Sequence, residues 1–218
     1  ALQLEPGESR EVVFRLGAAR DTRAATRCVQ QYRGLQAAMD EFDKVSAYWR
    51  RTLDTVQIET PEPALDVLAN GWLMYQVIAC RFWARSGFYQ SGGAIGFRDQ
   101  LQDSMAMVHA APAAARQHLL ACAARQYVEG DVQHWWHPPL QRGVRTRCSD
   151  DLLWLPLAAS RYVEATGDYA VLDEPVGYLE GRALNAGEES YYDLPGHSAL
   201  VEGLYQHCQR ALGHALKC

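Results

Sequence analysis

Over residues 21–54, apolar side chains recur at the three- to four-residue spacing of amphipathic helices, and capping and helix-breaking residues mark further helices up to residue 216. No alternation of strands and helices of the βαβ kind follows residue 20, and no repeat of fixed period is present. The pattern predicts a mainly α fold in which helices are joined by long, aromatic-rich loops. We expect a toroid of helices with the loops gathered at one end, and a helical bundle is the alternative. Helices are expected over residues 21–54 (as two helices broken near Gly34), 64–83, 97–109, 113–128, 152–166 and 197–216.

The first twenty residues differ from the rest. Pro6-Gly7 is a turn sequence, and residues 12–16 form a β-rich run that ends at Gly17. Because a single strand is not stable alone, we interpret residues 1–20 as the end of a β-domain whose other strands lie outside this sequence. Residues 21–58 are then interpreted as a helical linker, and residues 59–218 as a separate helical domain that begins at a proline-rich break.

Composition excludes several classes of function. The formal net charge of −5 across 218 residues leaves no basic excess for nucleic acid. Six cysteines are scattered without a CxxC pair, which argues against a zinc site or a disulfide framework and favours reduced thiols on the cytoplasmic side of a membrane. The longest apolar run, residues 72–84, is too short to span a bilayer. Six tryptophans and eleven tyrosines are compatible with sugar stacking.

A glycine-rich turn before a helix is the first candidate for a binding site. Ser91-Gly92-Gly93 is followed by Gly96, and the helix starts at Phe97 with Arg98 and Asp99 side by side. Glycine lets backbone approach a ligand closely, and a helix N-terminus presents unpaired N–H groups. An arginine and an aspartate there can donate to and accept from a polyhydroxylated ligand. The alternative is a capped helix with a local ion pair.

Two long connections interrupt the helices. Residues 131–148 and 172–193 have neither helical nor strand periodicity, and both are predicted to be loops. We expect three clusters, at residues 92–99, 133–137 and 145–151, to converge. The chemistry of a sugar site requires an aromatic platform, arginine and carboxylate contacts to hydroxyls, and an acid. Those residue types are supplied by Arg98, Asp99, His134, Trp135, Trp136, His137, Arg145, Arg147, Asp150 and Asp151.

Each of these residues has a simpler interpretation. His134 and His137 lack a third ligand at a suitable spacing, so no metal is predicted. Asp150 and Asp151 follow Ser149 at a helix start, where capping explains them. The remaining candidates are the arginines of the third cluster and the cysteine beside them. Arg145 and Arg147 are either phosphate contacts or solvated loop charges, and Cys148 lacks the setting of a nucleophile.

Four stretches carry a joint signature: GGAIGFRDQLQD, QHWWHPP, RGVRTRCSDDLLWLP and EESYYDLP. Together these motifs resemble those of the glycoside hydrolase family 94 phosphorylases. Within that family, the phosphorylase-like region of cyclic β-1,2-glucan synthases and the 1,2-β-oligoglucan phosphorylases look most similar. The resemblance implies part of an (α/α)6 barrel, preceded by a helical linker and the last strand of a β-sandwich. It also implies inverting phosphorolysis of a β-glucoside to α-glucose 1-phosphate, with inorganic phosphate as co-substrate and no cofactor.

The resemblance assigns roles to some residues, and two functional features of the family have no match in this sequence. Arg98 and Asp99 match the family's Arg-Asp pair, which holds the sugar undergoing cleavage, and we expect Trp135, Trp136 and His134 to contribute. Some relatives carry another arginine a few residues earlier, where Ser91 to Ala94 offer none. The family's general acid belongs to a Trp-Asn-Asp motif that this sequence lacks, so no catalytic residue is predicted and residues 59–218 correspond to about half of the barrel.

The expected partners follow from these assignments. They are a β-glucan oligosaccharide, phosphate, the rest of a parent chain in the inner membrane of a Gram-negative bacterium, and further copies of this chain through exposed half-barrel faces. Alternatives are another disaccharide phosphorylase, a carbohydrate-binding module without catalytic power, and a purely structural helical domain.

Overall fold

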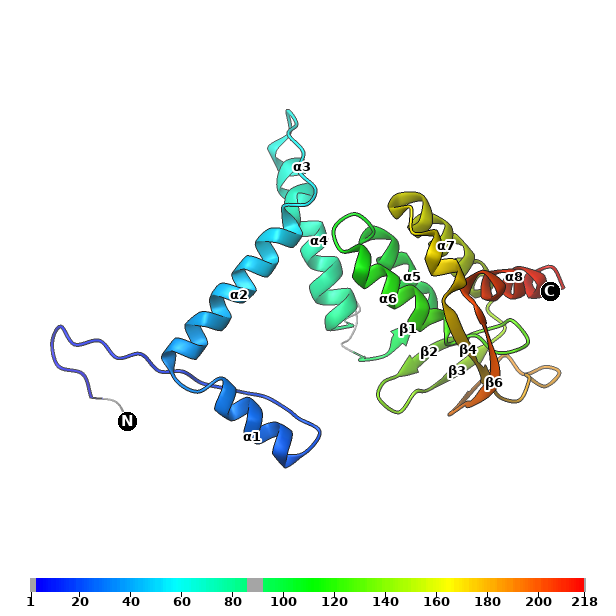
Figure 1. Ribbon diagram of the computed structural model, residues 1–218, viewed down its shortest axis with the longest axis horizontal. Helices are drawn as coiled ribbons and strands as arrows, with labels where there is room; N and C mark the ends of the chain where they lie inside the picture. Colours follow the sequence, from blue (N-terminus) through cyan, green and yellow to red (C-terminus); the bar gives the residue numbers. More distant parts are fainter. Residues whose placement is uncertain (1–2, 86–91, 218) are drawn as a thin grey trace. The chain divides into compact units, whose positions relative to one another are not determined.

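A computed structural model describes residues 3–85 and 92–217. The chain divides into two compact units, residues 1–52 and 53–218. About half of the described residues are helical, and the strands form two antiparallel sheets (Figure 1). The prediction of a mainly α fold is confirmed by this helical content.

Two helices account for most of the first unit. Helix α1 (Thr22–Gln31) begins where Asp21 Oδ1 accepts a hydrogen bond from the Ala24 amide at 2.8 Å. Helix α2 (Leu35–Leu53) follows Gly34, whose φ of +91° is one that glycine adopts without strain. The expected pair of helices, broken near Gly34, is therefore confirmed.

The strand expected at residues 12–16 does not form. No β-partner lies opposite it among the described residues, and an isolated strand leaves its backbone groups unpaired. Instead, the Arg15 guanidinium donates to the carbonyl oxygens of Val29 and Tyr32 at 2.6 and 3.2 Å. Phe14 and Leu16 are almost fully exposed.

The helix expected over residues 64–83 is built from four short pieces. They are α3 (Pro63–Val67), η1 (Leu68–Trp72), α4 (Leu73–Gln76) and η2 (Val77–Trp83), where both η segments have π-helical hydrogen bonding. The interruption lies at Gly71, with φ of +143°. There the Asn70 side chain accepts from the Ile58 amide at 2.6 Å and donates to the Ile58 carbonyl at 2.8 Å.

Residues 64–83 are apolar on most of their helical circumference, which predicts burial on several sides, but this prediction is wrong for the described chain. Only Gly71 and Ile78 are buried. Trp72, Leu73 and Trp83 remain about half exposed because none of the described elements covers that face.

The core of the second unit lies between four helices. Helices α5 (Phe97–Ala106), α6 (Pro112–Ala123), α7 (Asp151–Thr166) and α8 (Leu204–Ala215) pack through apolar faces. The first three correspond to predicted helices, although α6 ends at Ala123 and not near residue 128. Fully buried side chains at their contacts include Phe97, Leu101, Leu119, Leu155, Leu204 and Ala211.

The predicted loop over residues 131–148 is a β-hairpin. Strands β2 (Gln133–His137) and β3 (Arg142–Thr146) pair antiparallel inside a sheet of order β1-β2-β3-β5, completed by β1 (Ile95–Gly96) and β5 (Ser190–Asp193). An irregularity between Gln133 and Trp135 breaks the alternation of side chains, which hides the strand from a period-two pattern.

A second hairpin occupies much of the other predicted loop. Strands β4 (Pro175–Glu180) and β6 (Gly196–Gly203) pair antiparallel after a short 3-10 helix, η3 (Tyr169–Asp173). The last helix consequently begins at Leu204 and not at residue 197. Proline is tolerated at the first position of a strand, so Pro175 did not exclude this one.

Two further observations concern compartment and thiols. Within residues 3–85 and 92–217, no helix combines the length and apolar character needed to cross a bilayer. Cys28, Cys80, Cys122, Cys148 and Cys208 are free thiols.

Candidate functional site

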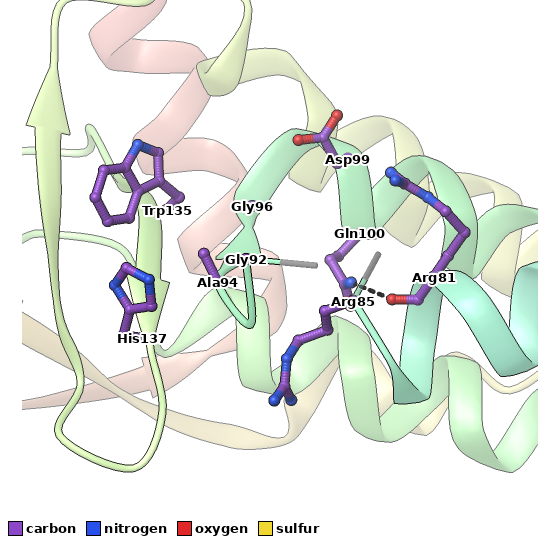
Figure 2. Close-up of a pocket in the computed structure, with 9 residues that line it drawn as sticks. All are labelled: Arg81, Arg85, Gly92, Ala94, Gly96, Asp99, Gln100, Trp135 and His137. Carbon is purple, nitrogen blue, oxygen red and sulfur yellow. Dashed lines mark hydrogen bonds between the residues drawn. The ribbon is translucent and has the colours of Figure 1, made fainter. Parts of the chain in front are cut away.

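A cavity of about 440 Å³ opens where β2 faces the start of α5 (Figure 2). Strand β1 leads into α5 and pairs with β2, with Ile95 opposite Trp136 and Gly96 opposite Trp135. Residues 92–99, the first predicted cluster, are described, whereas Ser91 of the glycine-rich turn lies outside the described residues. The expected convergence of the first two clusters is therefore confirmed by strand pairing.

Asp99 reaches the cavity from the first turn of α5. Gly96 is the N-cap, and a Cβ atom at that position would lie 2.5 Å from Asp99 Oδ2. The glycine thus lets the carboxylate fold back against the backbone at the helix start. Asp99 is exposed and lines the cavity with Gln100, which comes from the same turn.

Trp135 and His137 share one face of β2. Their rings lie 5.2 Å apart in an edge-to-face arrangement, and the Tyr192 ring lies 5.6 Å from Trp135. Figure 2 shows Trp135 and His137 side by side on the strand. They form an aromatic wall that a sugar ring can stack against. His137 was among the residues considered from the sequence, but it was not assigned to substrate.

Trp136 does not share this role. It points to the opposite face, is only 3% exposed, and has the Arg125 guanidinium 5.2 Å from its ring centroid. Alternation along a strand allows only one of two adjacent tryptophans to face the cavity. Trp136 was expected to contact the sugar, but it lies in the core instead.

Two arginines that sequence reasoning missed line the opposite side of the cavity. Arg81 lies in η2 and Arg85 lies just beyond it. Gln100 Nε2 donates to the Arg81 carbonyl at 2.8 Å, and Arg81 Nε donates to Asp103 at 3.0 Å. These bonds fasten η2 to α5. Arg85 Nε is buried and has no hydrogen-bond partner among the described residues. No local sequence signal joins these arginines to Asp99, because only the packing of η2 on α5 brings them together.

A second polar cluster lies at the start of α7. Arg98 Nη1 donates to Asp150 Oδ2 at 2.9 Å, and His134 Nδ1 lies 2.6 Å from Asp151 Oδ2. The third predicted cluster therefore also converges on the other two. The simpler interpretation required an ion pair between Arg98 and its neighbour Asp99. Arg98 pairs with Asp150 instead.

The capping interpretation of Asp150 and Asp151 is wrong. Asp150 occupies the N-cap position with helical dihedral angles, φ of −71° and ψ of −23°, and its side chain makes no capping hydrogen bond. The Asp150 carboxylate accepts from Arg98 instead.

The charges of this cluster perturb one another. Hydrogen bonds from the Cys148 thiol, at 3.0 Å, and from Arg98 hold the pKa of Asp150 well below its usual range. The same Asp150 contact raises the pKa of the Cys148 thiol to about 11. The hydrogen bond with Asp151 raises the pKa of His134, which favours the imidazolium form.

Arg145 is neither a solvated loop charge nor an available phosphate contact. Its side chain is 2% exposed, and all three guanidinium nitrogens donate within the chain. The acceptors include Asp131 and Glu129, and the guanidinium stacks over the Tyr127 ring at 3.9 Å. Arg147 is exposed and donates to two backbone carbonyls of residues 185–188, so it holds that turn.

One group of side chains has the chemistry of a metal site. The sequence predicted no metal at His134 and His137, and His137 is not part of this group because it packs on Trp135. His134, Cys148 and Asp151 instead place one ligand atom each within 4.8 Å of one another.

Comparison with known proteins places the chain in a family. Residues 48–218 match the family described as "Glycosyl hydrolase 94 superfamily, catalytic domain". The chain therefore belongs to glycoside hydrolase family 94, as its motifs predicted.

Individual relatives extend this result. The chain is 42% identical over 99% of its length to the cyclic β-(1,2)-glucan synthase NdvB of Rhizobium meliloti. It is 29% identical over 91% of its length to a solabiose phosphorylase of Paenibacillus borealis, and 27% identical over 87% to an N,N'-diacetylchitobiose phosphorylase of Vibrio proteolyticus. It spans 8% of the length of the synthase and about a quarter of each phosphorylase.

Proposed function

We propose that this chain holds the glucosyl unit of a β-1,2-glucan in a larger enzyme that works by inverting phosphorolysis or its reverse. The observation that carries the proposal is the cavity between β2 and α5, where an aromatic wall faces a carboxylate and a cationic side. Trp135 stacks on the sugar ring, Asp99 accepts from its hydroxyls, and Arg85 donates to it. Arg85 supplies the contact for which Ser91 to Ala94 offered no arginine.

The reaction requires only one acid from the protein. Phosphate attacks the anomeric carbon, so a single carboxylic acid protonates the departing oxygen and no second carboxylate acts as base. Neither Asp150 nor Asp151 fills that role, because they are bound to Arg98 and His134 and neither lines the cavity. We propose that the acid, and the helices that complete an (α/α)6 barrel, belong to a part of the enzyme outside residues 1–218.

The choice of glucan rests on the relatives. The identity of 42% to a cyclic β-(1,2)-glucan synthase favours β-1,2-glucan over the substrates named for the phosphorylases at 27–29%. A 1,2-β-oligoglucan phosphorylase remains the alternative of the same class. A non-catalytic carbohydrate-binding module is the alternative of a different class, and the absence of a Trp-Asn-Asp motif motivates it.

Calorimetric titration with a linear β-1,2-gluco-oligosaccharide tests the binding role. We expect Trp135→Ala and Asp99→Ala to weaken binding by about tenfold or more, as expected for loss of a stacking face or of a hydrogen bond to a charged group. Trp72→Ala is the matched control, since that exposed tryptophan does not line the cavity. Unchanged affinity in both cavity variants would contradict the proposal.

A phosphorolysis assay separates the enzyme from its alternatives. The chain alone, mixed with β-1,2-glucan and phosphate, should release no α-glucose 1-phosphate. Robust turnover would show that the acid lies within these residues. The same assay on the full-length parent protein should give turnover that Asp99→Ala abolishes, whereas a binding module would remain inactive.

A further inference from the structure

The cluster at the start of α7 has a use that the sugar cavity does not require. We propose that His134, Cys148 and Asp151 form a binding site for a divalent transition metal of the zinc class. Three separate segments supply the ligands: strand β2, the turn after β3, and the first residue of α7. None of the three side chains lines the sugar cavity, so this inference does not depend on the proposed function.

The geometry of the cluster is close to that of a metal centre. The three ligand atoms lie within 4.8 Å of one another. Zinc binds nitrogen, oxygen and sulfur at about 2.0–2.3 Å, which places tetrahedral ligands roughly 3.3–3.8 Å apart. Side-chain shifts of about an ångström close that gap, and solvent completes the fourth position.

A buried oxygen points independently to a ligand. The Asp151 side chain is 3% exposed, and its Oδ1 atom has no hydrogen-bond partner while Oδ2 bonds to His134. An unsatisfied buried carboxylate oxygen is costly. A cation coordinated by Asp151 Oδ1 would give this oxygen a partner and leave the hydrogen bonds of α7 unchanged.

The charges also balance. Metal binding releases the Cys148 thiol proton and the extra proton of the His134 imidazolium to solvent, so the neutral imidazole, the thiolate and the Asp151 carboxylate together neutralise a divalent cation. Arg98 does not add uncompensated positive charge beside them, because it is paired with Asp150 at 2.9 Å. Asp150 now accepts the thiol hydrogen of Cys148, and it would lose that hydrogen bond on metal binding while keeping its ion pair with Arg98.

The donor set decides the kind of metal. A thiolate and an imidazole are soft to intermediate ligands that favour zinc, cobalt and related ions, whereas magnesium and calcium require oxygen ligands. The three ligands could not be identified from the sequence, because His134 and Cys148 are fourteen positions apart and zinc motifs do not have that spacing. The β2–β3 hairpin folds the two together.

Titration of the reduced chain with Co²⁺ at pH 8 tests the site. We expect one Co²⁺ per chain, with the intense near-ultraviolet absorption of a cobalt–thiolate bond, and displacement by Zn²⁺. Cys148→Ser should abolish that absorption, and Asp151→Asn should weaken Co²⁺ binding at least tenfold. Cys28→Ser is the matched control, because Cys28 is an exposed free thiol distant in sequence from the cluster.

The outcomes are distinguishable from misfolding. Serine can keep the hydrogen bond to Asp150, and circular dichroism with a thermal melt checks each variant. His134→Gln is the second variant, and it should lose Co²⁺ binding while all thiols remain. Binding should also weaken as pH falls, because His134 and Cys148 must lose protons to coordinate. Absorption that survives in Cys148→Ser, that is lost in Cys28→Ser, or that never appears would overturn the proposal.

Discussion

Asp150 and Asp151 are adjacent in the chain, yet their carboxylates bind to different elements. Asp150 accepts hydrogen bonds from Arg98, Cys148 and Trp154, while the buried Asp151 binds His134. A Ser-Asp-Asp sequence before an apolar run is the usual sign of a helix cap, which is why the sequence predicted one. Arg98 is 52 residues away, and no local pattern could reveal that it takes the carboxylate instead.

His134 makes the stability of the fold depend on pH. Because its pKa is raised above 6.5 in the folded protein, its charged contribution is complete below pH 6.5 and is lost as pH rises through the folded pKa. Replacing it by glutamine, which stays neutral, should therefore cost more at pH 6 than at pH 9, on the order of 1 kcal/mol.

Urea unfolding of wild type and His134→Gln at both pH values measures this difference. His109→Gln, at an exposed histidine of the same unit, provides the control variant. Equal costs of His134→Gln at pH 6 and pH 9 would contradict an imidazolium paired with Asp151.

Gly96 controls where Asp99 points. A Cβ at this position would meet Asp99 Oδ2 at 2.5 Å, so Gly96→Ala should displace the carboxylate and weaken oligosaccharide binding about tenfold while the fold persists. Calorimetry and a thermal melt report both effects. Gly213→Ala on α8 meets nothing within 4 Å and serves as the matched control. Wild-type affinity in Gly96→Ala would show that Asp99 does not touch the sugar.

At the scale of elements, the β2–β3 hairpin organises both polar clusters. One face of β2 carries Trp135 and His137 toward the cavity, and the other buries Trp136. Sequence reasoning predicted that these residues gather with Arg98 and Asp99, but it predicted a loop. Aromatic and histidine side chains on both faces, together with the irregularity at His134, leave no apolar–polar alternation to detect.

The hairpin depends on Gly143. A Cβ there would lie 2.1 Å from the Trp135 carbonyl oxygen and 2.8 Å from Trp136 Cα, and neither backbone atom can move without separating the strands. Gly143→Ala should therefore destabilise the fold by about 1–3 kcal/mol. Urea unfolding measures it, with Gly177→Ala in β4 as a strand control in open space. A loss of stability no larger than that of Gly177→Ala would contradict this role.

At the scale of the whole chain, helices were predictable and strands were not. Periodic apolar spacing identified α1 and α2, while the residues that start and end helices identified α5, α6 and α7. The strands are two to eight residues long and depend on partners distant in the sequence. The strand expected at residues 12–16 failed for the same reason, since its partners are not among the described residues. The barrel remains a proposal.

Exposed apolar residues on α7 predict self-association. Leu153 and Leu157 are four residues apart on one helix face and are 51% and 45% exposed. Sedimentation velocity should show association that rises with concentration and that falls in the Leu153→Ser/Leu157→Ser variant. Leu140→Ser, at a lone exposed leucine in the hairpin turn, should leave association unchanged. A monodisperse monomer at all concentrations would contradict the prediction.

The single strand β2 carries His134 and Trp135 as neighbours, one for the proposed metal and the other for the proposed sugar. A ligand that shifts β2 when it binds to one of these residues also shifts the other residue, and so changes the affinity for the second ligand. Thermodynamic linkage makes such an effect symmetric: the factor by which zinc changes the affinity for glucan equals the factor by which glucan changes the affinity for zinc.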